Sequence, residues 1–135
     1  MIQFDLLYSC KSGIAIIYTS WLGLIAFLIG GFDILVSTLV LLMLIDYITG
    51  IICGYKTATL NSKRAYRGIK KKVMVLCILC GATLMNRLIP GVGIRDLVGI
   101  FYCATELLSI IENAEKIGVP IPEQLRKALE QCKKK

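Results

Sequence analysis

Hydrophobic residues in the first part of the chain form one long run, from about Gly13 to Tyr55. As a single helix this run would be ~63 Å long, about twice the thickness of the hydrocarbon core of a bilayer. Paired glycines followed by an aspartate at 30–33 are the natural place for the chain to turn back. We therefore expect two membrane spans here, at about 13–31 and 34–54.

A second hydrophobic region follows a polar stretch. It contains a predicted span at about 73–89, closed by Pro90-Gly91, and another at about 96–111. The pattern predicts an all-α integral membrane protein with four spans. The number falls to three if 13–31 does not fully cross, because Trp21 lies near its middle and tryptophan prefers the membrane interface.

The chain after the last predicted span is expected to lie outside the hydrocarbon. We divide the protein into a transmembrane domain, 1–117, and a cytoplasmic amphipathic helix with a basic tail, 118–135. Glycine and prolines between 118 and 122 interrupt the chain. A helix at about 122–132 would place four small or apolar residues on one face: Leu125, Ala128, Leu129 and Cys132.

Composition supports a membrane location. The apolar fraction is 56% and the mean hydropathy is +0.72, whereas soluble domains are about 45–50% apolar. A short water-soluble chain has too much surface to hide so much hydrocarbon. In a bilayer the same side chains are solvated by lipid.

Positive charge is concentrated between the second and third predicted spans, and the net charge of the chain is +7. We expect residues 56–72 to form a basic loop, with Ser62 as the N-cap of the helix that follows. No acid lies in this stretch, whose basic residues are Lys56, Lys63, Arg64, Arg67, Lys70, Lys71 and Lys72. Basic loops stay cytoplasmic. With four spans both termini are then cytoplasmic; with three, the N-terminus is outside and the C-terminus inside.

Two acids fall inside predicted spans, Asp46 in the second and Glu106 in the fourth. An ionised acid at the centre of a bilayer costs about 2.5–3.5 kcal/mol on insertion scales, so each needs a partner, water or a proton. Around Glu106 the spacing of polar residues is helical, and the stripe consists of Tyr102, Glu106, Ser109 and Asn113. Such a stripe faces either another helix or water, and oligomerisation around water would satisfy it. A purely structural hydrogen bond between helices is the alternative.

The second predicted span also contains a small-residue motif. Gly50 and Gly54 form a GxxxG, which lets membrane helices approach closely. Asp46 and Thr49 lie on a neighbouring side of the same helix, so we expect these four residues to form a packed interface.

No set of residues suited to catalysis is apparent. The chain has no histidine, no glycine-rich phosphate loop and no metal-ligand spacing in an exposed segment. Cys77 and Cys80 form a CxxC, but within a membrane helix cysteine is expected to pack as a small hydrophobe. Nucleic-acid binding is disfavoured because few aromatic residues accompany the basic stretch. We expect a protein that is not an enzyme, with no cofactor and no metal.

Several short motifs occur in an order that resembles the toxin-secretion/phage-lysis holin family, the small phage holins. The resemblance covers about residues 33–130 and rests on Asp46-Tyr47-Ile48-Thr49-Gly50, Gly68-Ile69-Lys70-Lys71-Lys72, Phe101-Tyr102, Glu106-Leu107-Leu108-Ser109-Ile110-Ile111-Glu112-Asn113 and Gly118-Val119-Pro120-Ile121-Pro122. The six cysteines are not part of this pattern.

The resemblance implies a multi-pass protein of the host bacterium's cytoplasmic membrane that forms homo-oligomers and opens lesions in the bilayer. It further implies a functional link to a cell-wall hydrolase or an exported toxin. Two alternatives remain: a small transporter or ion-channel subunit that uses Asp46 and Glu106 as coupling sites, and an antiholin of the same architecture.

Overall fold

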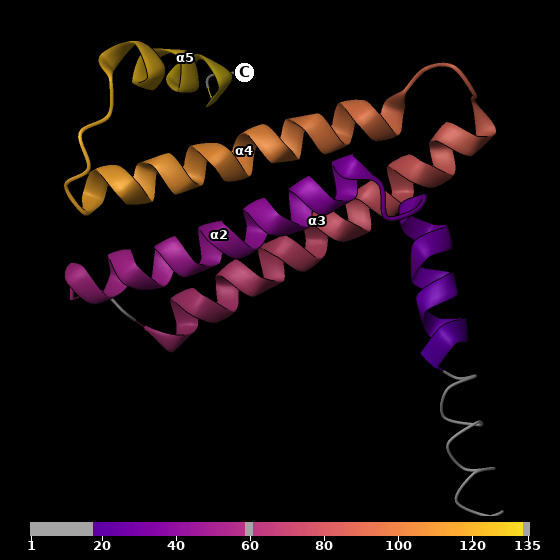
Figure 1. The fold of residues 1–135 in the computed structure, drawn as a ribbon, viewed down its shortest axis with the longest axis horizontal. Coiled ribbons are helices and arrows are strands. Elements are labelled where there is room, and N and C mark those ends of the chain that lie inside the picture. The colour runs from indigo at the N-terminus through magenta and orange to yellow at the C-terminus, as the bar shows by residue number, and fades with distance from the viewer. Residues whose placement is uncertain (1–17, 59–60, 134–135) are drawn as a thin grey trace, which may run out of the picture.

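A computed structural model describes residues 18–58 and 61–133, and the regular structure within them is entirely α-helical (Figure 1). This confirms the predicted fold class at the level of helices. The described helices are a short apolar one at Tyr18–Ile29, α2 at Ile34–Lys56, α3 at Ser62–Leu88, α4 at Ile94–Lys116 and α5 at Glu123–Lys133.

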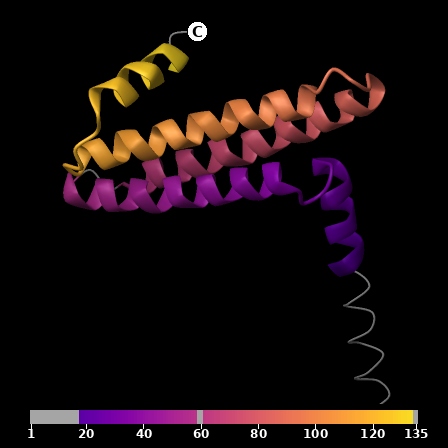
Figure 2. The ribbon, with the colours of Figure 1, turned by 45° about the horizontal axis from the view of Figure 1, so that its top comes forward.

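The three long helices, α2, α3 and α4, lie side by side in an up-down-up arrangement (Figures 1 and 2). α4 packs along both of its neighbours, whereas α2 and α3 touch at few positions. Their shared core consists of Val36, Leu39, Met43, Val75 and Leu79, with Val98, Tyr102 and Cys103 packed against it. The bundle is therefore held together mainly through α4.

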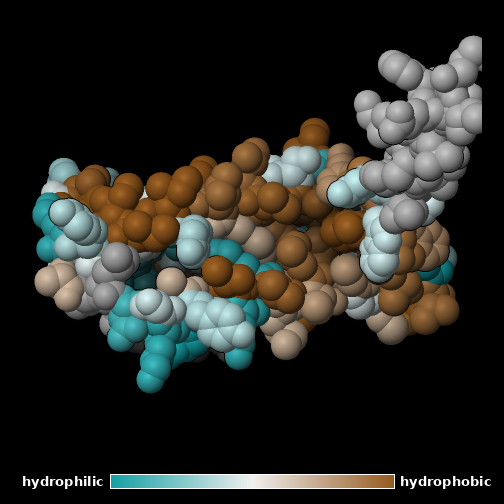
Figure 3. Space-filling view, turned by 90° about the horizontal axis from the view of Figure 1, so that it is seen from below, coloured by the Kyte–Doolittle hydropathy of each residue, from teal (hydrophilic) through white to brown (hydrophobic). Residues whose placement is uncertain are grey.

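Large apolar side chains cover the outside of the bundle, which is the reverse of a water-soluble protein. Figure 3 shows hydrophobic side chains along most of one face, with hydrophilic ones gathered toward one end. Within the described residues, α2 is the one helix that is long and apolar enough to cross a membrane by length and composition. Its 23 residues extend ~34 Å.

α3 and α4 differ from α2 because each carries ionisable residues along its length. The exposed apolar side chains on α3 include Val73, Met74 and Ile78, and those on α4 include Leu97 and Ile100. Both helices thus combine a lipid-compatible outer surface with charged positions elsewhere.

The segment predicted as the first span does not run beside the other three helices. Its described part, Tyr18–Ile29, turns away from the N-terminal end of α2 and points away from the bundle in both ribbon views (Figures 1 and 2). The turn between them uses Gly30 and Gly31, both with positive φ, a conformation that favours glycine. Residues 13–17 of the predicted span lie outside the described residues.

The prediction of a basic loop at 56–72 was wrong for most of its length, because α3 already begins at Ser62. The N-cap is Asn61, not Ser62; the Asn61 side chain accepts a hydrogen bond from the Lys63 amide at 3.0 Å. Lysine, arginine and alanine are good helix formers and make up most of 62–72, so a helix forms there once it is capped, in spite of Gly68. The basic residues therefore extend α3 beyond its apolar part.

The end of the chain follows the predicted pattern closely. α4 begins after Gly93 and is longer at both ends than the predicted 96–111. α5 occupies the place of the predicted terminal helix, and its Arg126 lies 3.6 Å from Glu115 of α4. Of the predicted apolar face of α5, Leu125 and Ala128 are exposed, and the side chains of Leu129 and Cys132 lie outside the described part.

Candidate functional site

A charged cluster joins the three long helices near the middle of the bundle. Lys72 of α3 contacts an acid on each neighbour: its Nζ lies 2.8 Å from Oδ2 of Asp46 on α2 and 2.5 Å from Oε2 of Glu106 on α4. The two predicted membrane acids are therefore brought together, and one lysine pairs with both.

Hydrogen bonds extend this cluster along α2 and α4. The Asn113 side-chain amide donates to Oδ1 of Asp46 and to the Thr49 hydroxyl oxygen, each at 3.2 Å. The Thr49 hydroxyl in turn donates to the Asp46 backbone carbonyl at 3.0 Å. The cluster thus consists of Asp46, Thr49, Lys72, Glu106 and Asn113, and we call it the charged cluster.

Burial makes the pairing in this cluster important. Glu106 is only 4% exposed, and the side chains of Lys72 and Asp46 are 17% exposed. Charges removed from water are costly unless they are paired and hydrogen-bonded. Two carboxylates face one ammonium group here, so Lys72 is the residue on which both acids depend.

A groove of about 600 Å³ leads from the charged cluster toward the end of the bundle at which α3 begins. It opens because α2 and α3 make few contacts there. Its walls combine small residues with polar ones, including Gly50, Gly54, Ala65, Gly68, Ser109 and Lys116. The groove therefore lies between α2 and α3 and reaches the charged cluster at Asp46, Lys72 and Asn113.

The predicted polar stripe on α4 faces the inside of this bundle. Tyr102 packs against the hydrophobic core, with its ring edge-on to Phe101 at 5.3 Å, and Glu106 contacts Lys72. Ser109 lines the groove, and Asn113 bonds to α2. Of the two predicted environments, a helix partner or water, the single chain thus provides the helix partner.

The predicted packing residues of α2 also lie on this side. A Cβ added at Gly50 would sit 3.7 Å from the Asn113 amide nitrogen, an ordinary contact, and Gly54 is buried. The tightest approach lies elsewhere: a Cβ at Gly99 of α4 would be 2.5 Å from Cδ2 of Leu35. Of Gly50 and Gly99, Gly99 is therefore the one at which a side chain would not fit between α2 and α4.

The basic residues in the first half of α3 fall into two groups. Lys63, Arg67, Lys70 and Lys71 are exposed, and the side chain of Arg64 lies outside the described part. Lys70 lies over the Tyr66 ring, 4.7 Å from its centroid. Lys72 alone among the described ones turns inward to the acids.

The role of Lys72 was not predicted from the sequence, because the basic residues were interpreted as a cytoplasmic loop and were not assigned to a helix face. A helical signal was present. The buried positions Leu79 and Val75 continue backward at steps of three and four residues to Lys72 and Gly68. Extending the helix to Asn61 would have placed Lys72 on the inner face, opposite Asp46 and Glu106.

A second polar group lies at the other end of the bundle and was not predicted. Arg95 of α4 is buried; its Nε donates to the Ile29 carbonyl at 2.9 Å and its Nη1 lies 2.7 Å from Oδ2 of Asp33. The hydrogen bond from Arg95, and next the one from the Val36 amide, hold the pKa of Asp33 below its usual 3.8. Arg95 thus fastens the end of the Tyr18–Ile29 helix to α2 and α4.

The cysteines form no cluster with other potential ligands in the described residues. Cys53, Cys77, Cys80 and Cys103 are free thiols, and Cys80 and Cys103 pack against the core. No group of three or more His, Cys, Asp or Glu residues that could hold a metal is found within 18–58 and 61–133.

Comparison with known proteins connects this geometry to a family. The sequence model of the bacteriophage holin family matches residues 23–134, which includes every helix of the bundle and the charged cluster. The chain belongs to the bacteriophage holin family. The resemblance seen in the sequence is thereby confirmed, and the protein is a holin-like membrane protein of a family that is not catalytic.

Individual relatives include uncharacterised bacterial proteins and one phage protein with a holin name. An uncharacterised 14.9 kDa protein from the nagH 3′ region of Clostridium perfringens is 40% identical over 114 residues, covering 83% of this chain and 86% of the relative. An uncharacterised Halalkalibacterium halodurans protein is 35% identical, covering 78% and 82%. A Bacillus phage phi105 protein named "Probable holin" is 34% identical over 85 residues, covering 62% and 63%. No solved structure matches the chain.

Proposed function

We propose that this protein permeabilises the bacterial cytoplasmic membrane as a homo-oligomer and so releases a lytic enzyme or toxin during phage lysis. Membership of the holin family supports the membrane role. The observation that carries the proposal further is the charged cluster: five polar side chains lie inside a bundle whose outside is apolar. In this proposal the polar side chains that line a lesion are enclosed inside the bundle of the single chain.

The single chain represents the closed form in this proposal. Lys72 pairs with both Asp46 and Glu106, so these acids have a partner inside the bundle and the polar stripe of α4 is kept from lipid. For an aqueous lesion the same stripe, Tyr102, Glu106, Ser109 and Asn113, turns toward water that is shared with other copies. For this rearrangement, the ion pairs of Lys72 with Asp46 and Glu106 have to break.

α3 is the helix best suited to move. It makes few contacts with α2, and the Lys72–Asp46 ion pair is a side-chain bond between these two helices. α2 and α4, in contrast, pack closely at Leu35 and Gly99. We infer that α2 and α4 stay together while α3 swings away from α2, because that motion breaks the fewest packing contacts.

Topology follows from charge in this proposal. The end of the bundle that carries the exposed Lys63, Arg67, Lys70 and Lys71 faces the cytoplasm, since basic residues flanking membrane helices are retained there. α2, α3 and α4 all cross the membrane, so the chain is multi-pass. The C-terminal helix and basic tail are cytoplasmic and contact anionic head groups.

Inducible expression in a bacterium tests the proposal directly. Membrane potential and release of a cytosolic enzyme are followed in the same culture, with and without a co-expressed cell-wall hydrolase. We expect an abrupt loss of potential after a delay, followed by lysis only when the hydrolase is present. Matched expression of the Lys72→Met variant reports on the charged cluster.

Other outcomes point to the alternatives. Saturable uptake of one solute without collapse of the potential would favour a transporter or channel subunit. A protein that is harmless alone and delays lysis by another holin would be an antiholin.

A further inference from the structure

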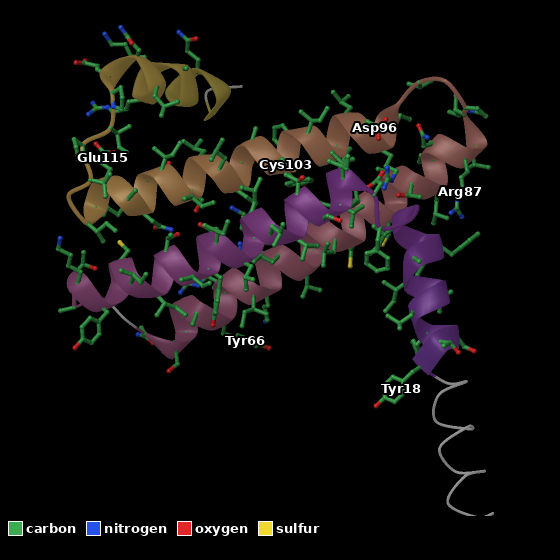
Figure 4. All side chains as sticks on the ribbon, in the orientation of Figure 1. Tyr18, Tyr66, Arg87, Asp96, Cys103 and Glu115 are labelled. Carbon is green, nitrogen blue, oxygen red and sulfur yellow. The ribbon has the colours of Figure 1, made fainter. Side chains whose placement is uncertain are left out.

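The short helix Tyr18–Ile29 is apolar, and most of its surface contacts nothing else in the described chain. The side chains of Tyr18, Trp21, Leu22, Leu24, Ile25 and Phe27 are all exposed. Figure 4 shows Tyr18 at the end of this helix that points away from the bundle. A hydrophobic helix with this much free surface needs another environment to cover it.

The orientation of the helix is fixed by polar contacts at its C-terminal end. The Ile29 carbonyl accepts from Arg95 Nε at 2.9 Å and from the Thr83 hydroxyl at 3.1 Å. The Phe27 carbonyl accepts from Arg87 Nη2 at 2.6 Å, and the Arg87 guanidinium also lies 3.8 Å from the centre of the Phe27 ring. These contacts attach the C-terminal end of the helix to the bundle.

The same contacts indicate the depth of the helix in a bilayer. α2 meets the requirements for a membrane span, and the Tyr18–Ile29 helix turns sharply away from the direction of α2 at its N-terminal end (Figures 1 and 2). Membrane helices tilt by about 20° on average, so a helix that turns away from the direction of α2 leans toward the membrane plane. Arg87, Arg95 and Asp33 mark this level as one where charge is present.

We propose that the Tyr18–Ile29 helix is a lipid-binding element that lies in the membrane interface and does not cross the bilayer. Trp21 and Tyr18 suit this position because their rings favour the boundary between head groups and acyl chains. The helix is apolar around most of its circumference, so it lies just beneath the head groups rather than on their water side. Its surface continues the lipid-facing side chains of α2.

Two consequences follow for the protein as a whole. The bundle then crosses the bilayer three times, and the interfacial helix lies on the face opposite the basic end of α3. This inference concerns the resting protein, so it holds or fails independently of whether the protein makes lesions.

Trp21 is the single tryptophan of the chain, so the wild-type protein reports its own depth. The purified full chain is reconstituted into phosphatidylcholine–phosphatidylglycerol vesicles containing lipid labelled with a nitroxide at carbon 5 or carbon 12 of the acyl chain. We expect the shallow carbon-5 label to quench Trp21 fluorescence at least twofold more than the carbon-12 label. A helix that spans at 13–31 would place Trp21 near the bilayer centre and reverse the order.

A second variant calibrates the measurement. Trp21→Phe combined with Ile45→Trp moves the fluorophore to an exposed position in the middle of α2. The carbon-12 label should then quench more strongly. Two further results would overturn the inference for wild-type Trp21: strong quenching by aqueous iodide with none by either lipid, which means a water-exposed helix, and protection from all three quenchers, which means coverage by a second copy.

Discussion

Lys72 of α3 lies between Asp46 of α2 and Glu106 of α4, at 2.8 and 2.5 Å from their carboxylate oxygens. The two acids are 60 positions apart in the chain. The sequence of its own helix does not identify a partner for either acid. Because α2 and α3 make few other contacts, this bridge is a principal link between them. Its removal should change both the stability of the bundle and the time at which lesions form.

Lys72→Met should destabilise the closed bundle. Removing one partner of a buried ion pair costs about 3–5 kcal/mol, since the remaining charge is left uncompensated. We expect a lower melting temperature in detergent and an earlier collapse of membrane potential at equal expression. Lys70→Met is the matched control, because Lys70 is exposed. Adding Asp46→Asn and Glu106→Gln should restore the melting temperature, and unchanged behaviour of Lys72→Met would mean that the bridge is dispensable.

Glu106→Gln should have a smaller effect in the same direction. The variant keeps the shape and hydrogen-bonding capacity of the side chain but removes its charge, and Lys72 retains Asp46 as a partner. Normal membrane insertion and a modest shift in lysis time are expected. Glu115→Gln, at a half-exposed position on the same helix, serves as the control. If Glu106→Gln cells lyse at the same time as wild-type cells, the charge of Glu106 does not affect timing, and its role is structural.

Gly50→Leu should weaken assembly while leaving insertion intact. Gly50 and Gly54 line the groove, and a large side chain would hold an approaching helix away. The measurement is the ladder of cross-linked oligomers in isolated membranes. Gly50→Ala is the control, because its Cβ would make only an ordinary contact with Asn113. An unaltered ladder in Gly50→Leu would show that this motif does not contact another copy.

A cysteine at position 62 should be protected from the outside of intact cells. Ser62 is exposed at the start of α3, beside the basic side chains that we place in the cytoplasm. In a cysteine-free background, an impermeant maleimide should label Ser62→Cys only after the cells are opened. Efficient labelling of intact cells would invert the topology.

Truncation after Ile117 should preserve lesion formation and alter its timing. α5 is outside the bundle and its described contact with α4 is the exposed Arg126–Glu115 pair, which is worth little. Its basic residues still affect the electrostatic balance at the membrane surface. Lysis curves of cells with equal amounts of the two proteins in the membrane test this. Complete loss of lysis in the truncated protein would mean that α5 is essential for lesion formation.

Helices with a simple periodic pattern were predictable from the sequence. α2 follows from an uninterrupted apolar run, and the glycines at 30–31 and the Pro90-Gly91 pair correctly mark turns, because these residues oppose a continuing helix. The high apolar fraction and the family resemblance were also predictable, since both depend only on the amino-acid sequence. The polar stripe of α4 was visible for the same reason.

Tertiary structure alone decided where these elements meet. The sequence suggested that Asp46 and Glu106 needed partners, but only the packing of α2 and α4 against α3 made Lys72 that partner. It likewise attached the C-terminal end of Tyr18–Ile29 to the bundle, through contacts to Arg87 and Arg95 more than fifty positions away. The local sequence pattern indicates which residues favour a helix and which face of that helix is apolar. The free energy of burying charge depends on distances between helices, and these exist only once the chain has folded.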